Sequence, residues 1–548
     1  MRKTRIIALA LAATGLFAAT GCDKKEKKET GKLPNAKDIV IFAGGSSEFS
    51  WSLGTKGQEV IDYIEKAFYE DTGKAVNFVV DVTQQGPSMN TTLPNDVTEG
   101  KVDVVISHTS GGDGIDDNMF NNELYYDLSR YMDSYFGEQI EDGNSPFVWK
   151  SADGSKTLDG LKRLTAQTDD GEQILGIPSV INPYKFGILV RKDWMREAGY
   201  TDDPAEEGKA YVGDFETFTQ MALDIKKNEG LDHAITGAMF DVEKVGLLGA
   251  YGIDAGYYTN TVYTEGENSY VGPGYINPKY ADVLALEYEW KTKGILEADC
   301  DNTLVATGEN NFIAGKSAIF VQDPTITHLI EIARRTKAAD PTAEFTVLGA
   351  LTKDKNSTDK GFMRNSTATF AASVGAKSKV VGEIMAFVNW MYSDKDNYLL
   401  CKYGREGTDW IYDEANQTYN YKTEAEYVSP NYSGILCLVE NQNVANLTYA
   451  GYSAEEKKWI ATAENPTNYR DNPTIDYLLL FPNGSELNTA KGNAASAISE
   501  NVVRKIWNGD ATFAGKIAEK FEQGRLGFVS TASNYMKEMY KLYSDLSK

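Results

Sequence analysis

The sequence has little cysteine and little histidine, with four cysteines and three histidines among 548 residues. The histidines His108, His233 and His328 are far apart, and no HExxH, CxxC or EF-hand pattern is present. The GxSxG sequence that marks the nucleophile turn of many hydrolases is also missing. A metal enzyme is therefore not expected, and the sequence predicts no metal site and no cofactor.

The shortage of cysteine also limits disulfide bonding. Cys22 belongs to an N-terminal pattern treated below, which leaves Cys300, Cys401 and Cys437. Three thiols cannot all pair within one chain. A disulfide between Cys401 and Cys437 and a set of buried free thiols are both consistent with the sequence.

Positive charge is in deficit as well, because 55 Lys and Arg residues face 79 Asp and Glu residues, a net charge of -24. A strongly acidic chain repels nucleic acid and anionic membrane surfaces, so neither is an expected partner. A polyanionic ligand is disfavoured for the same reason. Aromatic residues, by contrast, make up 11% of the chain, and exposed ones can stack on a ligand.

The one long apolar run lies at the N-terminus. Residues 1–5 carry three positive charges, and residues 6–19 are almost all apolar or small. This is the pattern of a secretory signal, and it is shorter than the ~20 apolar residues that span a membrane. Residues 1–21 are therefore predicted to be a signal peptide.

The residues Ala19-Thr20-Gly21-Cys22 resemble a bacterial lipobox. The resemblance implies cleavage before Cys22 and acylation of its thiol, with the mature chain anchored by lipid at the extracytoplasmic face of the cell membrane. An ordinary signal peptide followed by an unrelated cysteine is the alternative. Residues 23–32 are polar and cannot build a core, so residues 22–37 are interpreted as the lipidated cysteine and a flexible tether.

Apolar runs alternate with helical periodicity in the first part of the body. A strand, a helix and two more strands at short spacing favour a parallel α/β sheet, whose ligands bind beyond the carboxyl ends of the strands. The loops 44–52 and 108–114 are predicted to lie at those ends. The predicted strands are 38–43, 75–82 and 101–107, and the predicted helix is 58–68.

The same alternation continues along the chain, with no internal repeat and no long Pro- or Gly-rich linker. Domains in such a chain are expected to be joined by several short crossings rather than by one flexible joint. The further predicted strands are 186–191, 318–322, 345–351 and 368–374, and the predicted helices are 214–228, 280–293 and 379–392, with helical spacing again over 498–506.

Five segments, in this order, resemble extracellular solute-binding protein family 1, the sugar-type family whose lipoprotein members serve ABC importers. The segments are GIPSVINPYKFGILVRKDWMREAGY at 176–200, WKTKGIL at 290–296, FIAGKSAIFVQD at 312–323, FVNWMYS at 387–393 and YGREGTDW at 403–410. Each motif is weak alone, whereas the ordered set behind a lipobox is fairly specific. The match covers most of residues 38–548.

The resemblance implies an α/β fold with two lobes, of the type II periplasmic-binding-protein class, with an interlobe cleft and multiple hinge crossings. It implies a first lobe from residues 38–175 and about 362–430, and a second from residues 176–361 and about 431–548. It also implies a monomer without catalytic activity that captures a carbohydrate, more specifically an oligosaccharide, and delivers it to ABC importer permease subunits by hinge closure.

Sugar recognition needs aromatic faces for the C–H surface of the ring and planar polar groups for its hydroxyls. Residues of both kinds follow the predicted strand ends or lie in the family-like segments. The predicted ligand contacts are Glu48, Trp51, His108, Ser110, Asn182, Tyr184, Asp323, Thr325, Arg364, Glu406 and Trp410.

Most of these residues also have a structural interpretation. Trp51 can pack on its own lobe, and a lone histidine such as His108 is often a satisfied structural residue. Pro183 can set a turn, and Arg364 can form a salt bridge between lobes. The glycines of YGREGTDW can make that motif a structural turn rather than a binding element. The family often has a tryptophan near Thr325, so aromatic stacking is in doubt at that point.

Two other functions are consistent with the sequence. A secreted carbohydrate-active hydrolase would need two carboxylates at a set separation, and 79 acidic residues make chance pairs common. A sensory or adhesive binding protein would use the same fold and the same tether. Sugar release from oligosaccharides tests the first, and neighbouring genes for two importer permeases test the second.

Overall fold

The computed structural model describes most of the chain after residue 32. The described residues are 33–43, 53–82, 89–108, 124–131, 149–150, 156–157, 165–168, 171–179, 185–237, 246–253, 260–265, 268–300, 305–322, 324–365, 370–423, 426, 430–472 and 486–546. The predicted signal peptide, Cys22 and most of the predicted tether lie outside them.

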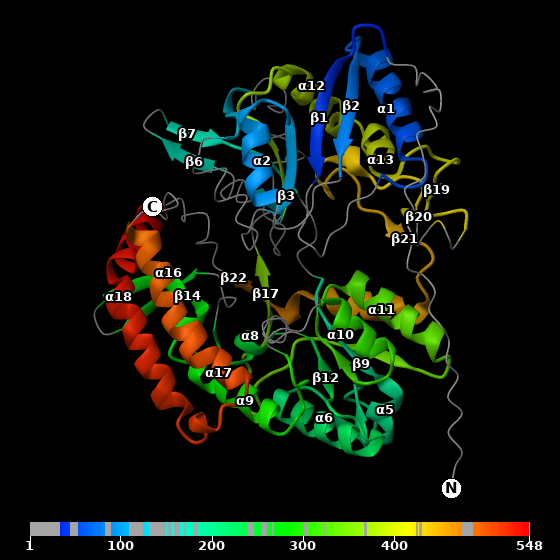
Figure 1. Ribbon diagram of the computed structural model, residues 1–548. Coiled ribbons are helices and arrows are strands. Elements are labelled where there is room, and N and C mark those ends of the chain that lie inside the picture. The colour runs from blue at the N-terminus through cyan, green and yellow to red at the C-terminus, as the bar shows by residue number, and fades with distance from the viewer. Residues whose placement is uncertain are drawn as a thin grey trace, which may run out of the picture.

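The first lobe is built on a five-stranded sheet with the order β2-β1-β3-β18-β8. Strand β1 is parallel to both of its neighbours, β2 and the central strand β3, and β18 is antiparallel to β3 and β8. In Figure 1 the strands β1 and β2 run downward, so that their carboxyl ends face the second lobe. The strands are β1 (Lys37–Ala43), β2 (Val76–Asp81), β3 (Val104–His108), β8 (Ile177–Pro178) and β18 (Phe370–Val374).

Helices cover this sheet because each presents one apolar face. In α1 (Gly57–Thr72) the buried residues include Val60, Ile64 and Phe68, which recur at helical spacing, and Gly73 ends the helix at φ 70°. The Phe68 and Phe387 rings meet at 5.5 Å, which joins α1 to α12. The other helices of this lobe are α2 (Met89–Thr98), α12 (Val381–Ser393) and α13 (Lys395–Tyr403).

The second lobe is built on a four-stranded sheet with the order β12-β15-β9-β16. Strands β12 and β15 are parallel, whereas β9 is antiparallel to both β15 and β16. All four are buried, as expected for strands covered on both faces. They are β9 (Ile188–Arg191), β12 (Ile235–Thr236), β15 (Ile319–Phe320) and β16 (Phe345–Leu348).

The helices of the second lobe pack around Trp290, which is 1% exposed and donates its indole N–H to Thr219 over 2.7 Å. Asp214 caps α6 by accepting the Thr217 backbone N–H at 2.8 Å. The C-terminal helices α16 and α18 pack together on this lobe (Figure 1). The helices are α5 (Lys192–Glu197), α6 (Phe215–Glu229), α8 (Leu248–Ala250), α9 (Tyr280–Thr292), α10 (Val305–Ile313), α11 (Ile326–Ala339), α15 (Ala454–Ala463), α16 (Glu486–Ile498), α17 (Arg504–Trp507) and α18 (Ile517–Leu546).

Short hairpins and strand pairs complete the described elements. They are β4 (Trp149–Lys150) with β5 (Lys156–Thr157), β6 (Thr165–Thr168) with β7 (Gly171–Ile174), β10 (Tyr200–Thr201) with β11 (Ala210–Tyr211), β13 (Asn260–Glu265) with β14 (Asn268–Pro273), and β19 (Ile411–Asp413) with β20 (Thr418–Asn420) and β21 (Thr448–Tyr449).

A two-stranded parallel strip lies between the lobes, formed by β17 (Phe362–Asn365) and β22 (Tyr469–Asn472). At its base the rings of Phe186, Phe362 and Tyr469 meet at 5.5 to 6.4 Å. Gly249 of α8 approaches Gly361 so closely that a Cβ added there would lie 2.1 Å from the Gly361 carbonyl oxygen. This aromatic trio and the glycine contact fix the strip on the second lobe.

Packing corrects the predicted lobe boundaries. Ile177 belongs to the first sheet and its core, so the first lobe continues beyond the boundary predicted at 175–176. Phe362 packs in the second lobe, and the return to the first begins only near residue 370. Residues 432–447 pack in the first core, whereas Trp459 belongs to the second lobe, so the boundary expected near 430 lies beyond residue 447. A short buried loop carries no periodicity that would reveal such an assignment.

Candidate functional site

The first-lobe edge that faces the second lobe is only partly described. His108 is the last residue of β3, and its backbone lies opposite Phe370 of β18. This placement agrees with the predicted strand end, although the side chain of His108 is outside the description. Glu48, Trp51 and Ser110 lie outside the described residues. Their role as ligand contacts stays a prediction.

The corresponding edge of the second lobe is formed by the carboxyl ends of the parallel strands β12 and β15. Thr236 ends β12 and is followed by Gly237, whose φ is 133°. Gln322 follows β15 and is 2% exposed. An added Cβ on Gly237 would lie 2.9 Å from a methyl group of Val321, so glycine permits both the turn and the close packing at this edge.

Glu297 stabilises this edge of the second lobe by accepting hydrogen bonds from its residues. Its Oε1 accepts hydrogen bonds from the Gly237 backbone N–H at 3.0 Å and from the Thr236 hydroxyl at 3.2 Å. Its Oε2 accepts one from the Asn311 amide at 3.2 Å. Because the side chain is only 8% exposed, Glu297 serves as a buried anchor rather than as a surface group.

His233 lies next to this anchor, with Nε2 4.0 Å from Glu297 Oε2. Burial lowers the pKa of His233, and the attraction of Glu297 only partly opposes that effect. His233 Nε2 is buried and has no hydrogen-bond partner among the residues that the structure describes. The imidazole is therefore neutral near pH 7.

Thr325 lies at the start of α11 and is half-buried, beside the first crossing. Phe186 forms a backbone bridge with Thr325, and the Lys185 carbonyl accepts the Ile326 N–H at 2.7 Å. The predicted contacts Asn182, Tyr184 and Asp323 adjoin these residues in sequence but fall in undescribed positions. The structure thus brings the 185–186 and 324–326 segments together, as the prediction of a shared site requires.

Arg364 lies in β17, within the strip between the lobes, and its backbone partner in β22 is Asp471. This position is compatible with both roles that the sequence allows, contact with a ligand and a salt bridge between lobes. The side chain of Arg364 is not described, so both remain predictions.

The YGREGTDW motif has a structural role in the first lobe. Trp410 is 2% exposed, donates its indole N–H to the Gly404 carbonyl at 2.9 Å, and packs against the ring of Tyr403 at 5.0 Å. Arg405 binds both carboxylate oxygens of Asp409 at 2.8 and 3.1 Å. This burial contradicts a ligand contact by Trp410, because a buried indole presents no free face.

Glu406, the other predicted contact in this motif, is exposed in the turn that precedes Trp410. Arg405 beside it also donates to Glu59 of α1 at 2.6 Å, so the turn is fastened to the outer helix of the lobe. The placement of the motif therefore favours the structural reading over a binding role for Glu406.

Sequence reasoning missed a polar segment of the first lobe, Glu440 to Asn443, which follows the 3-10 turn Ile435–Cys437. Glu440 accepts a hydrogen bond from Lys402 at 2.7 Å, and the positive charge of Lys185 acts on it from the second lobe. The run Glu-Asn-Gln-Asn between two apolar stretches was the available signal. Its composition resembles that of many surface loops, so the sequence did not single it out.

The three cysteines of the body are free and buried. Burial raises the pKa of the Cys300 thiol to about 11 and that of Cys437 to about 12, which leaves them protonated and unreactive near pH 7. Of the two interpretations that the sequence allowed, the structure therefore has buried free thiols.

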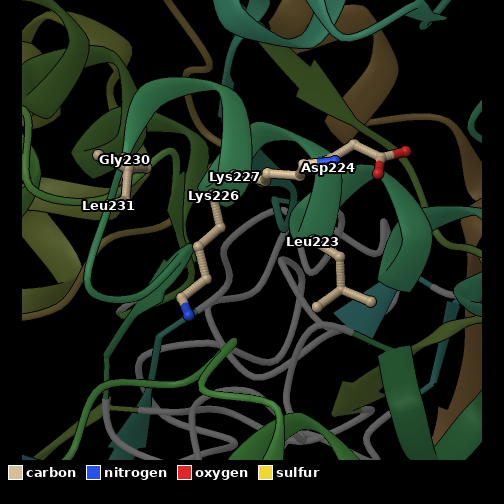
Figure 2. A pocket seen from close by; sticks show the side chains of 6 residues that line it. All are labelled: Leu223, Asp224, Lys226, Lys227, Gly230 and Leu231. Carbon is tan, nitrogen blue, oxygen red and sulfur yellow. The ribbon is translucent and has the colours of Figure 1, made fainter.

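A surface hollow at the C-terminal end of α6 is a poor candidate for the ligand site. Figure 2 shows that the Lys226 side chain points away from those of Asp224 and Lys227, so the three do not converge on one point. Asp224 is already bound by the Tyr200 hydroxyl at 2.6 Å. The hollow is lined by Leu223, Asp224, Lys226, Lys227, Gly230 and Leu231.

No group of three or more histidine, cysteine or carboxylate side chains in the described part of the chain is arranged to hold a metal ion. Within the same part, no helix combines the length and the apolar character needed to cross a bilayer.

Solved structures similar to this chain include solute-binding proteins. An extracellular solute-binding protein from Bifidobacterium longum subsp. infantis matches with a TM-score of 0.61 and 12% identity, over 93% of this chain and 98% of that one. The N-glycan transport solute-binding protein of Streptococcus pneumoniae in complex with Man5GlcNAc matches with a TM-score of 0.55 and 13% identity, over 93% and 99%.

A third similar structure is the ABC-transporter substrate-binding protein FusA of S. pneumoniae in complex with kestose, with a TM-score of 0.55 and 12% identity, over 93% of this chain and 100% of that one. No family model and no curated protein matches the sequence. Likeness at such low identity establishes the fold, and it confirms the predicted two-lobed α/β architecture of type II solute-binding proteins.

Proposed function

We propose that this protein is a lipid-anchored extracytoplasmic solute-binding protein that captures a carbohydrate, more specifically an oligosaccharide, and delivers it to an ABC importer. The observation that carries the proposal is the two-lobed fold with polar groups on both lobes, the half-buried Thr325 at the start of α11 on the second lobe and the partly exposed Glu440 on the first. The similar structures, which are described as binding N-glycan and kestose, support the carbohydrate class.

The mechanism requires binding and closure but no catalysis. A ligand that contacts both edges bridges the lobes and favours the closed arrangement, because only that arrangement offers both sets of contacts. The strip of β17 and β22 and the crossing near residue 450 give the lobes several connections about which to hinge. Importer permeases would then recognise the closed form.

A thermal-shift screen tests the carbohydrate class. The mature chain is heated with Man5GlcNAc, kestose and an alginate oligosaccharide, and in parallel with arginine and spermidine. Stabilisation by a saccharide alone is the expected result. Stabilisation by arginine or spermidine but by no saccharide would overturn the carbohydrate assignment. Release of free sugar from the same saccharides would instead indicate a hydrolase.

The lipid anchor has its own test. Cells that express the full chain are fed an alkyne-labelled fatty acid, and the wild type is compared with Cys22→Ala. Label in the wild type alone, with the variant released from the membrane fraction, is expected. Absence of label from the wild type, with both proteins released from the membrane fraction, would contradict the lipid anchor and favour an ordinary signal peptide.

A further inference from the structure

The backbone of the segment around Glu440 is held in place within the first lobe. Buried tyrosines fix its backbone on both sides, since the Val439 carbonyl accepts the Tyr392 hydroxyl at 2.8 Å and the Asn441 N–H donates to Tyr398 at 2.9 Å. Leu438, just before it, has φ 55° and ψ -62° and is the centre of a tight γ-turn, a rare and strained conformation in which the Val439 N–H donates to the Cys437 carbonyl at 2.6 Å. Such strain persists only where packing enforces it, and it is frequent at ligand sites.

The Glu440 carboxylate has one satisfied oxygen and one open oxygen. Oε1 accepts from Lys402 at 2.7 Å and from the Gln442 amide at 3.0 Å. Oε2 has no hydrogen-bond partner among the residues that the structure describes, and the side chain is 39% exposed. A carboxylate oxygen has room for two donors, so this arrangement leaves acceptor capacity for a ligand.

Lys402 is itself held in place by two tyrosine rings. Its ammonium lies 5.3 Å from the centre of the Tyr403 ring and 5.9 Å from that of Tyr398, and its side chain is 18% exposed. Burial alone would raise the pKa of Glu440, but Lys402, Gln442 and Lys185 outweigh burial and hold that pKa below its usual range. Glu440 is therefore ionised and oriented at neutral pH.

Lys185 relates Glu440 to the second lobe. Lys185 belongs to the second lobe, where its carbonyl accepts the Ile326 N–H and the next residue bridges to Thr325. Its charge nevertheless acts on Glu440 of the first lobe. Glu440 therefore lies within electrostatic reach of Lys185, whose neighbour Phe186 is bridged to Thr325.

We propose that Glu440 is a ligand-contacting residue of the first lobe, whose Oε2 accepts hydrogen bonds from hydroxyl groups of a saccharide that also contacts the Thr325 edge. Lys402 is the positioning residue that orients this carboxylate. The proposal rests on the proposed function for its ligand class. Neighbouring hydroxyls on one sugar ring suit the open oxygen, because a carboxylate accepts from hydroxyls with roughly twice the strength of a neutral group.

The test compares Glu440→Gln and Glu440→Ala with the wild type by isothermal titration, using the panel compound that stabilises the wild type most. Glu414→Gln is the matched control, because Glu414 is an exposed glutamate of the same lobe, in the turn between β19 and β20. We expect affinity to fall about tenfold or more in Glu440→Gln, further in Glu440→Ala, and less than about twofold in the control. Unchanged affinity in Glu440→Ala overturns the proposal.

Melting temperatures of the unliganded variants separate lost binding from lost folding, and Glu440→Gln keeps the shape of the side chain if Glu440→Ala is unstable. If only arginine or spermidine binds, the carbohydrate function fails. The contact itself is then judged with that compound: tenfold weaker binding in Glu440→Gln supports it, and unchanged binding overturns it.

Lys402→Met provides the readout for positioning. Without Lys402, burial dominates and the pKa of Glu440 rises, so binding should weaken at a higher pH than in the wild type as the solution is acidified. The other charged or titratable groups that act with Glu440 are Lys185, Tyr392, Tyr398, Tyr403 and Cys437. If binding weakens at the same acidic pH in Lys402→Met as in the wild type, Lys402 does not position Glu440.

Discussion

Each lobe places a glutamate at the edge that faces its partner, and the two glutamates are used in opposite ways. Glu297 of the second lobe is 8% exposed, and both its oxygens are engaged by Thr236, Gly237 and Asn311. Glu440 of the first lobe is 39% exposed, and its known partners share one oxygen. One carboxylate shapes an edge from inside, whereas the other is available at the surface.

The difference teaches that burial and unused hydrogen-bond capacity separate a scaffold from a contact. A buried carboxylate must have all its partners within the protein, because an unsatisfied buried group costs free energy. An exposed carboxylate can exchange water for a ligand at little cost. The same criterion assigns Trp410 to the scaffold.

The largest loss of stability is expected from Trp410→Ala. Deleting this buried indole removes packing against Tyr403 and Tyr412 and should lower the free energy of unfolding by about 3–5 kcal/mol. Trp410→Phe keeps most of the volume, and saccharide affinity should then stay within about twofold of the wild type by titration. A tenfold loss of affinity in Trp410→Phe would place Trp410 among the ligand contacts after all.

Glu297→Ala should come next, at about 3 kcal/mol, because it leaves the Gly237 N–H, the Thr236 hydroxyl and the Asn311 amide without an acceptor. Urea unfolding measures the loss, and Glu414→Ala should change stability by less than about 0.5 kcal/mol. If Glu440→Ala lowers stability as much as Glu297→Ala does, the distinction between scaffold and contact fails.

A substitution beside the strip of β17 and β22 should lower the free energy of unfolding by a smaller amount. Gly249→Ala forces a Cβ into the Gly361 carbonyl and should cost about 1–3 kcal/mol. Gly382→Ala is the matched control, because an added Cβ meets nothing within 4 Å there and helix α12 should gain up to about 1 kcal/mol. Thermal unfolding of both variants is the measurement, and equal destabilisation would show that the close contact is irrelevant.

The smallest effect on stability is expected from a change of pH, which acts through His233 beside Glu297. Burial lowers the pKa of His233 in the folded chain, so the unfolded chain binds a proton more readily. Stability should be complete above the unfolded pKa of about 6.5 and should fall as pH drops below it, until the folded pKa is reached. His233→Gln should flatten this part of the stability curve, as chemical unfolding between pH 5 and 8 will show. An unchanged slope would contradict the burial of a neutral imidazole.

Long periodic elements were predictable from the sequence because their signals are local. The strand predicted over 38–43 is β1, and the helices predicted over 214–228 and 379–392 are α6 and α12, within a residue or two at each end. Buried strands with runs of β-branched residues, and helices with one apolar face, can be predicted from their own residues without reference to the rest of the chain.

The lobe boundaries and the described site were less accessible. Residues 432–447 have no helical or strand period, so nothing local tied them to the first lobe. Thr325 was chosen for its place after a strand and lies at the interlobe side, whereas Trp410 was chosen as an aromatic in a motif and is buried. The residue types that favour sugar contacts are also those that fill cores, and side-chain identity alone cannot separate the two.

The sequence by itself determined the export pattern ending at Cys22, the acidic charge, the α/β class and the order of most strands and helices, because each depends on composition or on short-range period. Only the tertiary structure decided that Glu297 is inside and Glu440 partly exposed, that Trp410 is scaffold, and that the charge of Lys185 in the second lobe acts on Glu440 in the first. These outcomes depend on interactions between residues far apart in the sequence, which no local pattern encodes.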